Sequence, residues 1–498
     1  MDRTVGTVGT YGTYLRYGTY AEATVRSTIR WRTKRLYWKD LQAKMVREMV
    51  MVQVGQCGNQ IGRRFWLELV QEAASQVQGG FDAAMSALFR NVDARYEPAI
   101  ELDVGSLLAS LRARAILVDT EEGVVSETRR HPILGDLFEE TQVITDVGGA
   151  GNNWASGYAS YGPKLQLRVE AALRKAVEAC DSPQAFFLVY SVGGGTGSGL
   201  GSSVLELLRD MYPDLCRFNV AVYPSADYED VITGPYNAVL ATKWLTEASD
   251  CVIPLENSAL LDYRARQAGL GASQLPDGID TGFDGINDVI AQLLSHLTAG
   301  ARYPGGLNMD FNEITTNLVP FQQLHYLTAS FSPLLRCNRS NLNLDKREHR
   351  IFLEACATTS KLVTTYAKTS QTSSNRALAC AVFARGKVAS ANLIHASNCL
   401  RPSLKLPQWN PDGLKMGLCR VPPLGASSAV LCLKNSPAIA QNFDTLKNRF
   451  NKLYQVKAML HHYTQVVDAT VFEDAINDLE GVIECYKNAD LNAPNFHV

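Results

Sequence analysis

Short apolar runs alternate with longer segments of helical periodicity from residue 49 onward. An unbroken apolar run between polar loops is typical of a buried strand, and apolar residues that recur every three or four positions indicate an amphipathic helix. The runs predict strands at residues 49–54, 115–118, 142–146, 185–190 and 218–223. Helices are predicted at residues 61–77, 163–179 and 201–211, after Pro235, and at 282–297. Repeated strand–loop–helix units predict an α/β fold with a doubly wound parallel sheet.

The last third of the chain has a different pattern. Strand-like runs at residues 377–383 and 429–433 indicate a second α/β domain. Two apolar stripes then predict a C-terminal helical hairpin packed on the body, and core packing alone explains both stripes. The stripes comprise Leu446, Phe450, Leu453 and Leu460, and then Phe472, Ile476, Leu479, Ile483 and Tyr486. We divide the chain into residues 1–44, a first α/β domain at 45–256, a long core helix with the second α/β domain at 257–435, and C-terminal helices at 436–498.

Composition narrows the class of protein. The 498 residues are 46% hydrophobic and 20% charged, which is typical of a globular protein. A net charge of −2 and the lack of any apolar run of 18 residues predict neither a nucleic-acid nor a membrane partner. The 11 cysteines are scattered without a CxxC pair, which predicts reduced thiols and no structural zinc.

Residues 1–44 differ from the rest of the chain. They begin with Gly-Thr repeats and hold nine Lys or Arg against three Asp or Glu, a net charge of +6. An Arg-rich, acid-poor stretch also fits a transit peptide. We interpret it as a low-complexity, disordered extension, or as an upstream stretch wrongly included in the translated chain.

The segment SVGGGTGSGL at residues 191–200 lies between a predicted apolar strand and a predicted helix. Glycines without Cβ let successive N–H groups approach a phosphate, and a following helix adds free N–H groups and a positive dipole end. Thr196 and Ser198 add hydroxyl donors. Neither GxxxxGK[ST] nor GxGxxG fits, because no Lys follows the glycines and the last Gly is missing. We predict a phosphate loop of another kind rather than a flexible linker.

Three further loops follow predicted strands. They read GQCGNQ at residues 55–60, DTEEG at 119–123 and GGAGNN at 148–153. In a doubly wound sheet, ligands bind at the carboxyl ends of the strands. The loops therefore converge on one crevice, which is a stronger signal than any single loop.

These motifs resemble the tubulin family over almost all of residues 45–488. The matching segments are VGQCGNQIG (54–62), GAGNNWA (149–155), GGGTGSG (193–199) and NLVPFQQLHY (317–326). Within the family the epsilon branch is most similar, through FRNVD (89–93), EEGVV (121–125), DVITGPYN (230–237) and LNMDFNEITTNLVPF (307–321). Alpha and beta chains end in a long Glu-rich tail, whereas this chain ends in CYKNADLNAPNFHV.

The resemblance implies GTP or GDP in the crevice of a GTP-binding domain at residues 45–256, with Mg²⁺ beside it. It implies that the glycine loop wraps the phosphates, that residues 150–152 close over the terminal phosphate, and that two carboxylates lie near the metal. Two asparagines suit the guanine edge, a phenylalanine can stack on the base, and an aspartate lies near the ribose. The nucleotide set is Gly55, Gln56, Cys57, Gln60, Ala150, Gly151, Asn152, Ser191, Gly193, Gly194, Gly195, Thr196, Gly197, Asp230, Asn257, Phe283 and Asn287, and the metal pair is Asp119 and Glu121.

Some of these positions have plainer readings or depart from the family. A cysteine at a strand end, such as Cys57, is more often a small buried hydrophobe. Asn257 and Asn287 taken alone are more often turn or cap residues. Ordinary tubulins tend to have an acid at the place of Gly234 and a Tyr at the place of Phe283. The site in this chain would therefore lack a carboxylate beside the ribose and a phenol hydroxyl beside the base.

Asp310 and Glu313 share one face of a predicted helix. Acids in the first turn can simply cap a helix, and Asn308 is a good N-cap. The family resemblance implies a second role, because this loop contacts the nucleotide of the next subunit in a filament. Alpha chains have an acid at the place of Glu313 that positions the attacking water, and beta chains have Lys there. We therefore predict a GTPase site completed only between subunits, with both acids as its catalytic residues.

The resemblance implies a cytoskeletal protein of centrioles or basal bodies. It would form or maintain compound microtubules with delta-tubulin and centriolar proteins. Residues 336–349, RCNRSNLNLDKREH, do not resemble the lateral-contact loop of alpha or beta chains, although a variable surface loop explains them equally well. One alternative is a general lattice subunit that copolymerises with alpha or beta chains. Another is a dinucleotide-dependent metabolic enzyme, which the lack of GxGxxG and of a catalytic His or Cys set disfavours.

Overall fold

The structure is a computed structural model. It divides the chain into two units, Met1–Val46 and Arg47–Val498, and describes parts of the second. The described residues are 47–76, 83–93, 100–101, 111–225, 231–267, 283–303, 305–332, 351–357, 362–363 and 376–491. Several sequence predictions lie outside them, namely the extension at 1–44, Asp230, the loop at 336–349 and residues 492–498.

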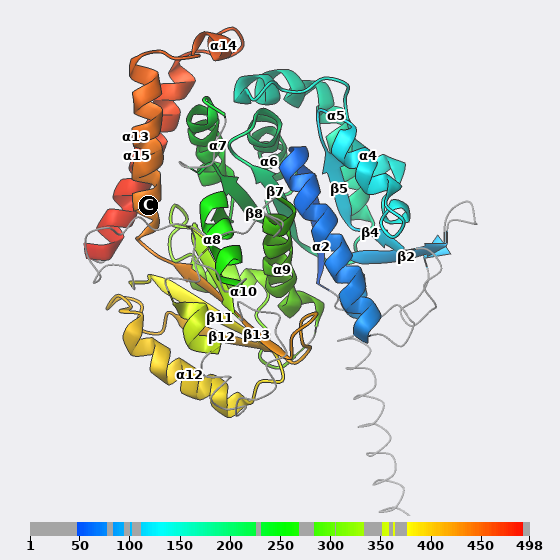
Figure 1. Cartoon of the computed structure of the whole chain (residues 1–498), viewed down its shortest axis with the longest axis vertical. Helices are drawn as coiled ribbons and strands as arrows, with labels where there is room; N and C mark the ends of the chain where they lie inside the picture. Colours follow the sequence, from blue (N-terminus) through cyan, green and yellow to red (C-terminus); the bar gives the residue numbers. More distant parts are fainter. Residues whose placement is uncertain are drawn as a thin grey trace, which may run out of the picture. The chain divides into compact units, whose positions relative to one another are not determined.

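A six-stranded parallel sheet forms the centre of the first domain (Figure 1). Its order is β6-β5-β1-β7-β8-β9. Strands β5 and β6 are therefore added on one side of the neighbouring pair β1 and β7, and β8 and β9 are added on the other side. Such a switch point leaves a crevice at the carboxyl ends of the strands. The bounds are β1 Glu48–Val54, β5 Ala115–Val118, β6 Val143–Ile144, β7 Pro183–Ser191, β8 Cys216–Tyr223 and β9 Cys251–Glu256.

Helices cover both faces of this sheet, which confirms the predicted doubly wound α/β fold. Alternate residues of β1, including Val50 and Val52, belong to a core shared with α5 (Gly162–Glu178), α6 (Gly201–Met211) and α7 (Gly234–Ala248). The opposite face carries α2 (Gly55–Gln76), where a Cβ on Gly62 would overlap the side chain of Gln53. Helix α9 (Phe283–Arg302) packs beside α2.

A second, four-stranded sheet has the order β10-β13-β11-β12, with only the β11–β12 pair parallel. Helix α12 (Ser390–Ser403) packs its apolar residues against one face of this sheet. The strands are β10 Leu327–Ser332, β11 Ala379–Gly386, β12 Leu414–Cys419 and β13 Ser428–Asn435.

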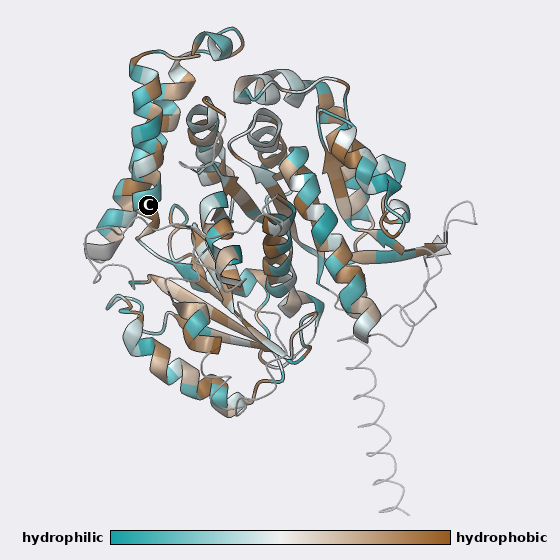
Figure 2. Cartoon of the chain, in the orientation of Figure 1, coloured by the Kyte–Doolittle hydropathy of each residue, from teal (hydrophilic) through white to brown (hydrophobic). Residues whose placement is uncertain are grey.

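The C-terminal helices form the predicted hairpin. Helices α13 (Ile439–Gln455) and α15 (Thr470–Leu491) lie side by side in Figure 1 and pack on α7. Tyr236 of α7 meets Phe450 and Phe472 edge to face, with ring centroids 5.3 and 5.4 Å apart. Figure 2 shows a mostly hydrophilic outward surface on α13. An apolar inner stripe and a polar outer face are what an amphipathic surface helix requires.

The remaining elements are short or peripheral. No described helix is long and apolar enough to cross a membrane. The other helices are α3 Ala83–Ser86, α4 Gly123–Arg130, α8 Asn257–Gln267, α10 Phe311–Leu318 and α14 His461–Thr464, with 3-10 turns at Gly135–Leu137 and Glu140–Gln142 and π-helical segments at Ser156–Tyr161 and Thr196–Leu200. A small sheet joins β3 Ile100–Glu101, β2 Phe89–Asp93 and β4 Leu111–Ala113.

Three local predictions need correction. The helix predicted from residue 61 begins at Gly55, because Gly55 adopts a positive φ of 71° and the chain turns from β1 directly into α2. The glycine segment is a loop only as far as Gly195, and Thr196–Leu200 already continues into α6. Leu460 lies beyond the end of α13 rather than on its stripe. The domain boundaries at 256 and 435 stay predictions.

Candidate functional site

A cavity of about 590 Å³ opens at the carboxyl ends of β1, β5, β7 and β8. Its position matches the switch point of the sheet, where doubly wound proteins bind their ligands. All the predicted nucleotide and metal residues that the structure describes line this one cavity. They are Gly55, Gln56, Cys57, Gln60, Asp119, Glu121, Ala150, Gly151, Asn152, Ser191, Gly193, Gly194, Gly195, Thr196, Gly197, Asn257, Phe283 and Asn287.

The glycine loop and the loop at 149–153 form one end of the cavity in direct contact. A Cβ on Gly195 would lie 2.5 Å from the Asn153 nitrogen and 3.0 Å from the Ala150 oxygen, so only glycine permits this approach. A Cβ on Gly194 would meet nothing within 4 Å, which leaves its backbone bare toward the cavity. Bare backbone beside the start of a helical segment suits a phosphate group.

The loop at 149–153 turns sharply through two successive left-handed residues. Gly151 and Asn152 have φ values of 58° and 53°, and the Asn153 N–H donates to the Ala150 carbonyl at 3.1 Å. Asparagine tolerates this conformation better than most side chains. The turn brings residues 150–152 to the cavity wall beside the glycine loop.

Two carboxylates lie on the β5 side of the cavity. Asp119 is only 4% exposed and accepts hydrogen bonds from the backbone N–H groups of Thr120 at 2.8 Å and Glu121 at 3.4 Å. Burial raises the pKa of Asp119 to about 6, and the two N–H donors oppose that shift. Glu121 is exposed. Among the described residues, no group of three or more side chains could hold a metal ion by itself. A Mg²⁺ ion here would therefore need water or phosphate oxygens as its other ligands.

The far end of the cavity suits a flat, polar ring. Asn287 is 4% exposed, and its Nδ2 atom has no hydrogen-bond partner within the described part of the chain. An unpaired buried donor costs free energy unless a ligand satisfies it. Phe283, one helical turn away on α9, is 67% exposed and lines the same cavity. Asn257 begins α8 at the same wall.

Cys57 combines cavity access with a neutral thiol. Its side chain is half-buried at the cavity wall, and burial raises the pKa of the thiol to about 12. The group is therefore a thiol rather than a thiolate at neutral pH. This state suits contact with a ligand and not nucleophilic chemistry.

Sequence reasoning missed several lining residues. Because ligands bind at the carboxyl ends of the strands, the residues that follow the strand predicted at 218–223 could have been predicted as lining residues. Two further lining residues, Ile286 and Ile290, fall within one or two turns of Phe283 on α9. The missed residues are Val54, Gly123, Val124, Val222, Tyr223, Pro224, Ser225, Val231, Ile286 and Ile290.

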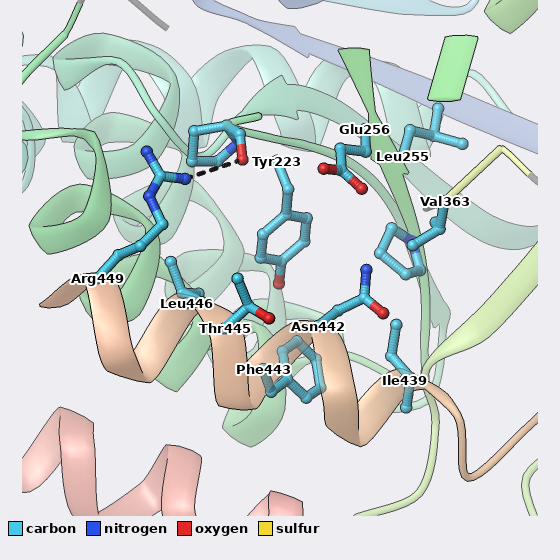
Figure 3. Close-up of a pocket in the computed structure, with 12 residues that line it drawn as sticks. Tyr223, Leu255, Glu256, Val363, Ile439, Asn442, Phe443, Thr445, Leu446 and Arg449 are labelled. Carbon is cyan, nitrogen blue, oxygen red and sulfur yellow. Dashed lines mark hydrogen bonds between the residues drawn. The ribbon is translucent and has the colours of Figure 1, made fainter. Parts of the chain in front are cut away.

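A smaller cavity of about 50 Å³ adjoins the first and shares Tyr223 and Pro224 with it. Helix α13 forms its other wall (Figure 3). The Arg449 Nη1 atom of that helix donates to the Pro224 carbonyl at 3.5 Å, drawn as a dashed line in Figure 3. The C-terminal helices therefore touch the wall of the larger cavity through the chain segment that follows β8.

Asp310 and Glu313, at the start of α10, lie near the amino ends of the sheet strands, at the end opposite the cavity. Phe311 packs against Phe187 and Phe218, and Asp310 pairs at 3.2 Å with Arg47, which immediately precedes β1. The Glu313 N–H donates to Asp310 Oδ1 at 2.7 Å, and the Asp310 N–H donates to Glu313 Oε2 at 3.2 Å. This is a capping box, so the helix-capping interpretation is right, but the N-cap residue is Asp310 and not Asn308. Neither acid lines the cavity of its own chain.

Comparison with known proteins places these features in one family. Residues 48–265 match the model described as Tubulin/FtsZ family, GTPase domain, and residues 322–448 match the model described as Tubulin C-terminal domain. The GTPase-domain match covers most of the cavity-lining residues and implies guanine-nucleotide binding.

Whole-length relatives agree. The tubulin epsilon chains of Homo sapiens and Mus musculus are each 42% identical over 468 residues, covering 89% of this chain and 96% of the relative. The tubulin beta-1 chain of Colletotrichum graminicola is 31% identical over 455 residues, covering 90% and 96%. The two domain matches and these near-complete alignments show that the chain belongs to the tubulin family.

Proposed function

We propose that this chain is an epsilon-type tubulin that binds GTP or GDP with Mg²⁺ and acts at centrioles or basal bodies, in the formation or maintenance of compound microtubules. Delta-tubulin and centriolar proteins are its proposed partners. The observation that carries the nucleotide part is that every described candidate nucleotide and metal residue lines one cavity. The 42% identity to chains named tubulin epsilon supports the branch.

The nucleotide is proposed to lie with its phosphates at the two touching loops and its base near α9. Gly194 and Gly195 supply backbone N–H groups beside Gly193, whose N–H donates to Ser191 Oγ at 3.3 Å, and the loop at 150–152 covers the terminal phosphate. The orphan amide of Asn287 offers a donor to the guanine edge, while Phe283 stacks on the ring. Asp119 and Glu121 hold Mg²⁺ through water or directly.

We further propose that hydrolysis needs two subunits. The cavity is at the carboxyl edge of the sheet, whereas Asp310 and Glu313 are at the amino edge. A head-to-tail contact between subunits joins two different surfaces, so it can bring the amino edge of one chain to the cavity of the next. Glu313 would then position or deprotonate the attacking water, with Asp310 holding the helix start that presents it.

The test uses Glu313→Gln, because glutamine can keep the capping box while it removes the carboxylate. A suitable partner tubulin loaded with GTP is mixed with the wild-type or variant chain, and phosphate release is followed. We expect Glu313→Gln to slow release by about 100-fold or more. The variant's own GTP affinity and melting temperature stay unchanged. Thr316→Ala, an exposed change on the same helix, serves as the matched control. Unchanged phosphate release from the Glu313→Gln mixture would refute this role.

The place of action needs a separate experiment. The endogenous, tagged chain is imaged beside markers for centrioles and for microtubules. Signal confined to centrioles or basal bodies supports the proposed specialised role and directs biochemistry toward delta-tubulin. Signal along all microtubules would instead mean a general lattice subunit and would contradict the proposal.

A further inference from the structure

One buried amide joins the two loops at the phosphate end of the cavity. Asn237 lies in α7 with its side chain fully buried. Its Nδ2 atom donates to the carbonyl of Asn152 at 2.8 Å and to the carbonyl of Gly193 at 2.9 Å. These two carbonyls belong to the two loops that touch at Gly195. One side chain therefore fixes the spacing between them.

The oxygen of the same amide also accepts two hydrogen bonds. Asn237 Oδ1 accepts from the Trp154 N–H at 2.9 Å and from the Tyr463 hydroxyl at 2.6 Å. A carboxamide has two donor hydrogens and two acceptor lone pairs, so all four positions are filled. No other residue type supplies two donors and two acceptors in this shape. An aspartate would set a carboxylate against the carbonyls of Asn152 and Gly193.

Asn152 is the strained member of this network. Its φ of 53° is unfavourable for any residue with a Cβ, so neighbouring contacts must hold it. Its carbonyl accepts from Asn237 and also from the Thr233 hydroxyl at 3.1 Å. The first turn of α7 and the residue before it thus stabilise the loop conformation that faces the cavity.

Tyr463 brings the C-terminal helices into the network. It belongs to α14 and is fully buried, whereas His461, His462 and Thr464 beside it are exposed. Its ring packs edge to face on Tyr236 at 5.7 Å. The adjacent backbone is attached as well, because the Asn153 side chain donates to the His462 carbonyl at 3.0 Å. The segment between α13 and α15 is therefore bonded to the loop at 149–153 directly through Asn153 and indirectly through Asn237.

We propose that Asn237 is a positioning residue for the phosphate loops and that the Tyr463 hydroxyl couples their geometry to the C-terminal helices. The inference rests on the proposed nucleotide site and adds a regulatory path to it. If a terminal phosphate shifts the loop at 150–152, the carbonyl of Asn152 shifts with it, and Asn237 passes the change to Tyr463. Coupling is reciprocal, so a partner bound to the α13–α15 connection changes the affinity for nucleotide by the same factor.

The first test needs no nucleotide. Hydrogen exchange is measured on the nucleotide-free full-length chain, in the peptide that contains the Trp154 amide. We expect Tyr463→Phe to speed that exchange about fivefold to tenfold, the equilibrium change produced by losing one buried hydrogen bond. Tyr486→Phe is the matched control. It is equally buried, and its hydroxyl accepts from the Tyr326 N–H at 3.0 Å rather than donating to Asn237. Equal exchange in wild type and Tyr463→Phe would overturn the inference.

The second test measures the ratio of the dissociation constants for GDP and GTP. We expect Tyr463→Phe to change this ratio at least threefold, whereas Tyr486→Phe leaves it at the wild-type value. Asn237→Asp should lower the affinity for both nucleotides. A wild-type chain that binds neither nucleotide refutes the proposed function, while the exchange experiment still decides the coupling between Tyr463 and the loops. A wild-type ratio in Tyr463→Phe would overturn the regulatory path.

Discussion

Replacement of Gly195 by alanine tests how closely the two phosphate loops pack. The residue has helical angles, φ −78° and ψ −51°, so alanine meets no backbone penalty. The new Cβ would lie 2.5 Å from a backbone nitrogen and 3.0 Å from a backbone oxygen of the loop at 149–153. Neither atom is the end of a flexible side chain, so one loop must move. Such overpacking costs about 1–3 kcal/mol. Alanine also lowers the conformational entropy of the unfolded chain, which stabilises the folded state by about 0.4–1 kcal/mol.

We therefore expect Gly195→Ala to lose about 1–2 kcal/mol of stability and most of its GTP affinity. Thermal unfolding without nucleotide and titration with a fluorescent GTP analogue measure the two effects. Gly194→Ala is the control, because its Cβ would meet nothing within 4 Å and its melting temperature should not fall. Gly194 lines the cavity, so the added methyl group of Gly194→Ala should weaken only the binding of GTP. Equal melting temperatures for wild type and Gly195→Ala would refute the reasoning.

Three further predictions concern other buried groups. Glu72→Gln should lower the free energy of unfolding in urea by about 3–5 kcal/mol, because the fully buried Glu72 contacts two buried arginines. As the control, Glu127→Gln should lower it by under about 1 kcal/mol, because the Glu127 carboxylate is 63% exposed in its ion pair. Burial lowers the pKa of His325 below its usual value, so the unfolded chain binds a proton that the folded chain excludes. Stability should therefore fall as the pH drops from 7 through 6.5, and His325→Asn should flatten that slope. Maleimide labelling at pH 8 should modify the exposed Cys399 long before Cys57, and rapid labelling of Cys57 would contradict its raised pKa.

The sequence was sufficient for five of the six strands of the first sheet, all but β9, and for most of the residues that line the candidate site. Unbroken apolar runs identified β1 and β7, and apolar periodicity identified α6 with the bounds that the structure has. The candidate residues share a cavity because carboxyl strand ends meet at one edge, which is a property of topology rather than of any single residue.

What could not be predicted depends on contacts between distant segments. The start of α2 was missed, because a helix that begins with glycines and asparagine looks like a loop until the turn at Gly55 is known. Asn237 gave a weak signal, as one amide in the apolar first half of α7. Its four partners come from three other segments, one of them more than 200 residues away. Periodicity contains no information about such pairings.

The most direct test of the account is to identify the nucleotide that the purified full-length chain carries. The chain is denatured, and the released small molecules are separated by chromatography beside GTP, GDP and NAD standards. We predict GTP or GDP in near-equimolar amount from the wild type and much less from Asn287→Ala, which lacks the orphan amide at the base end of the cavity. Release of NAD, or equal guanine nucleotide from both chains, would contradict the proposed site.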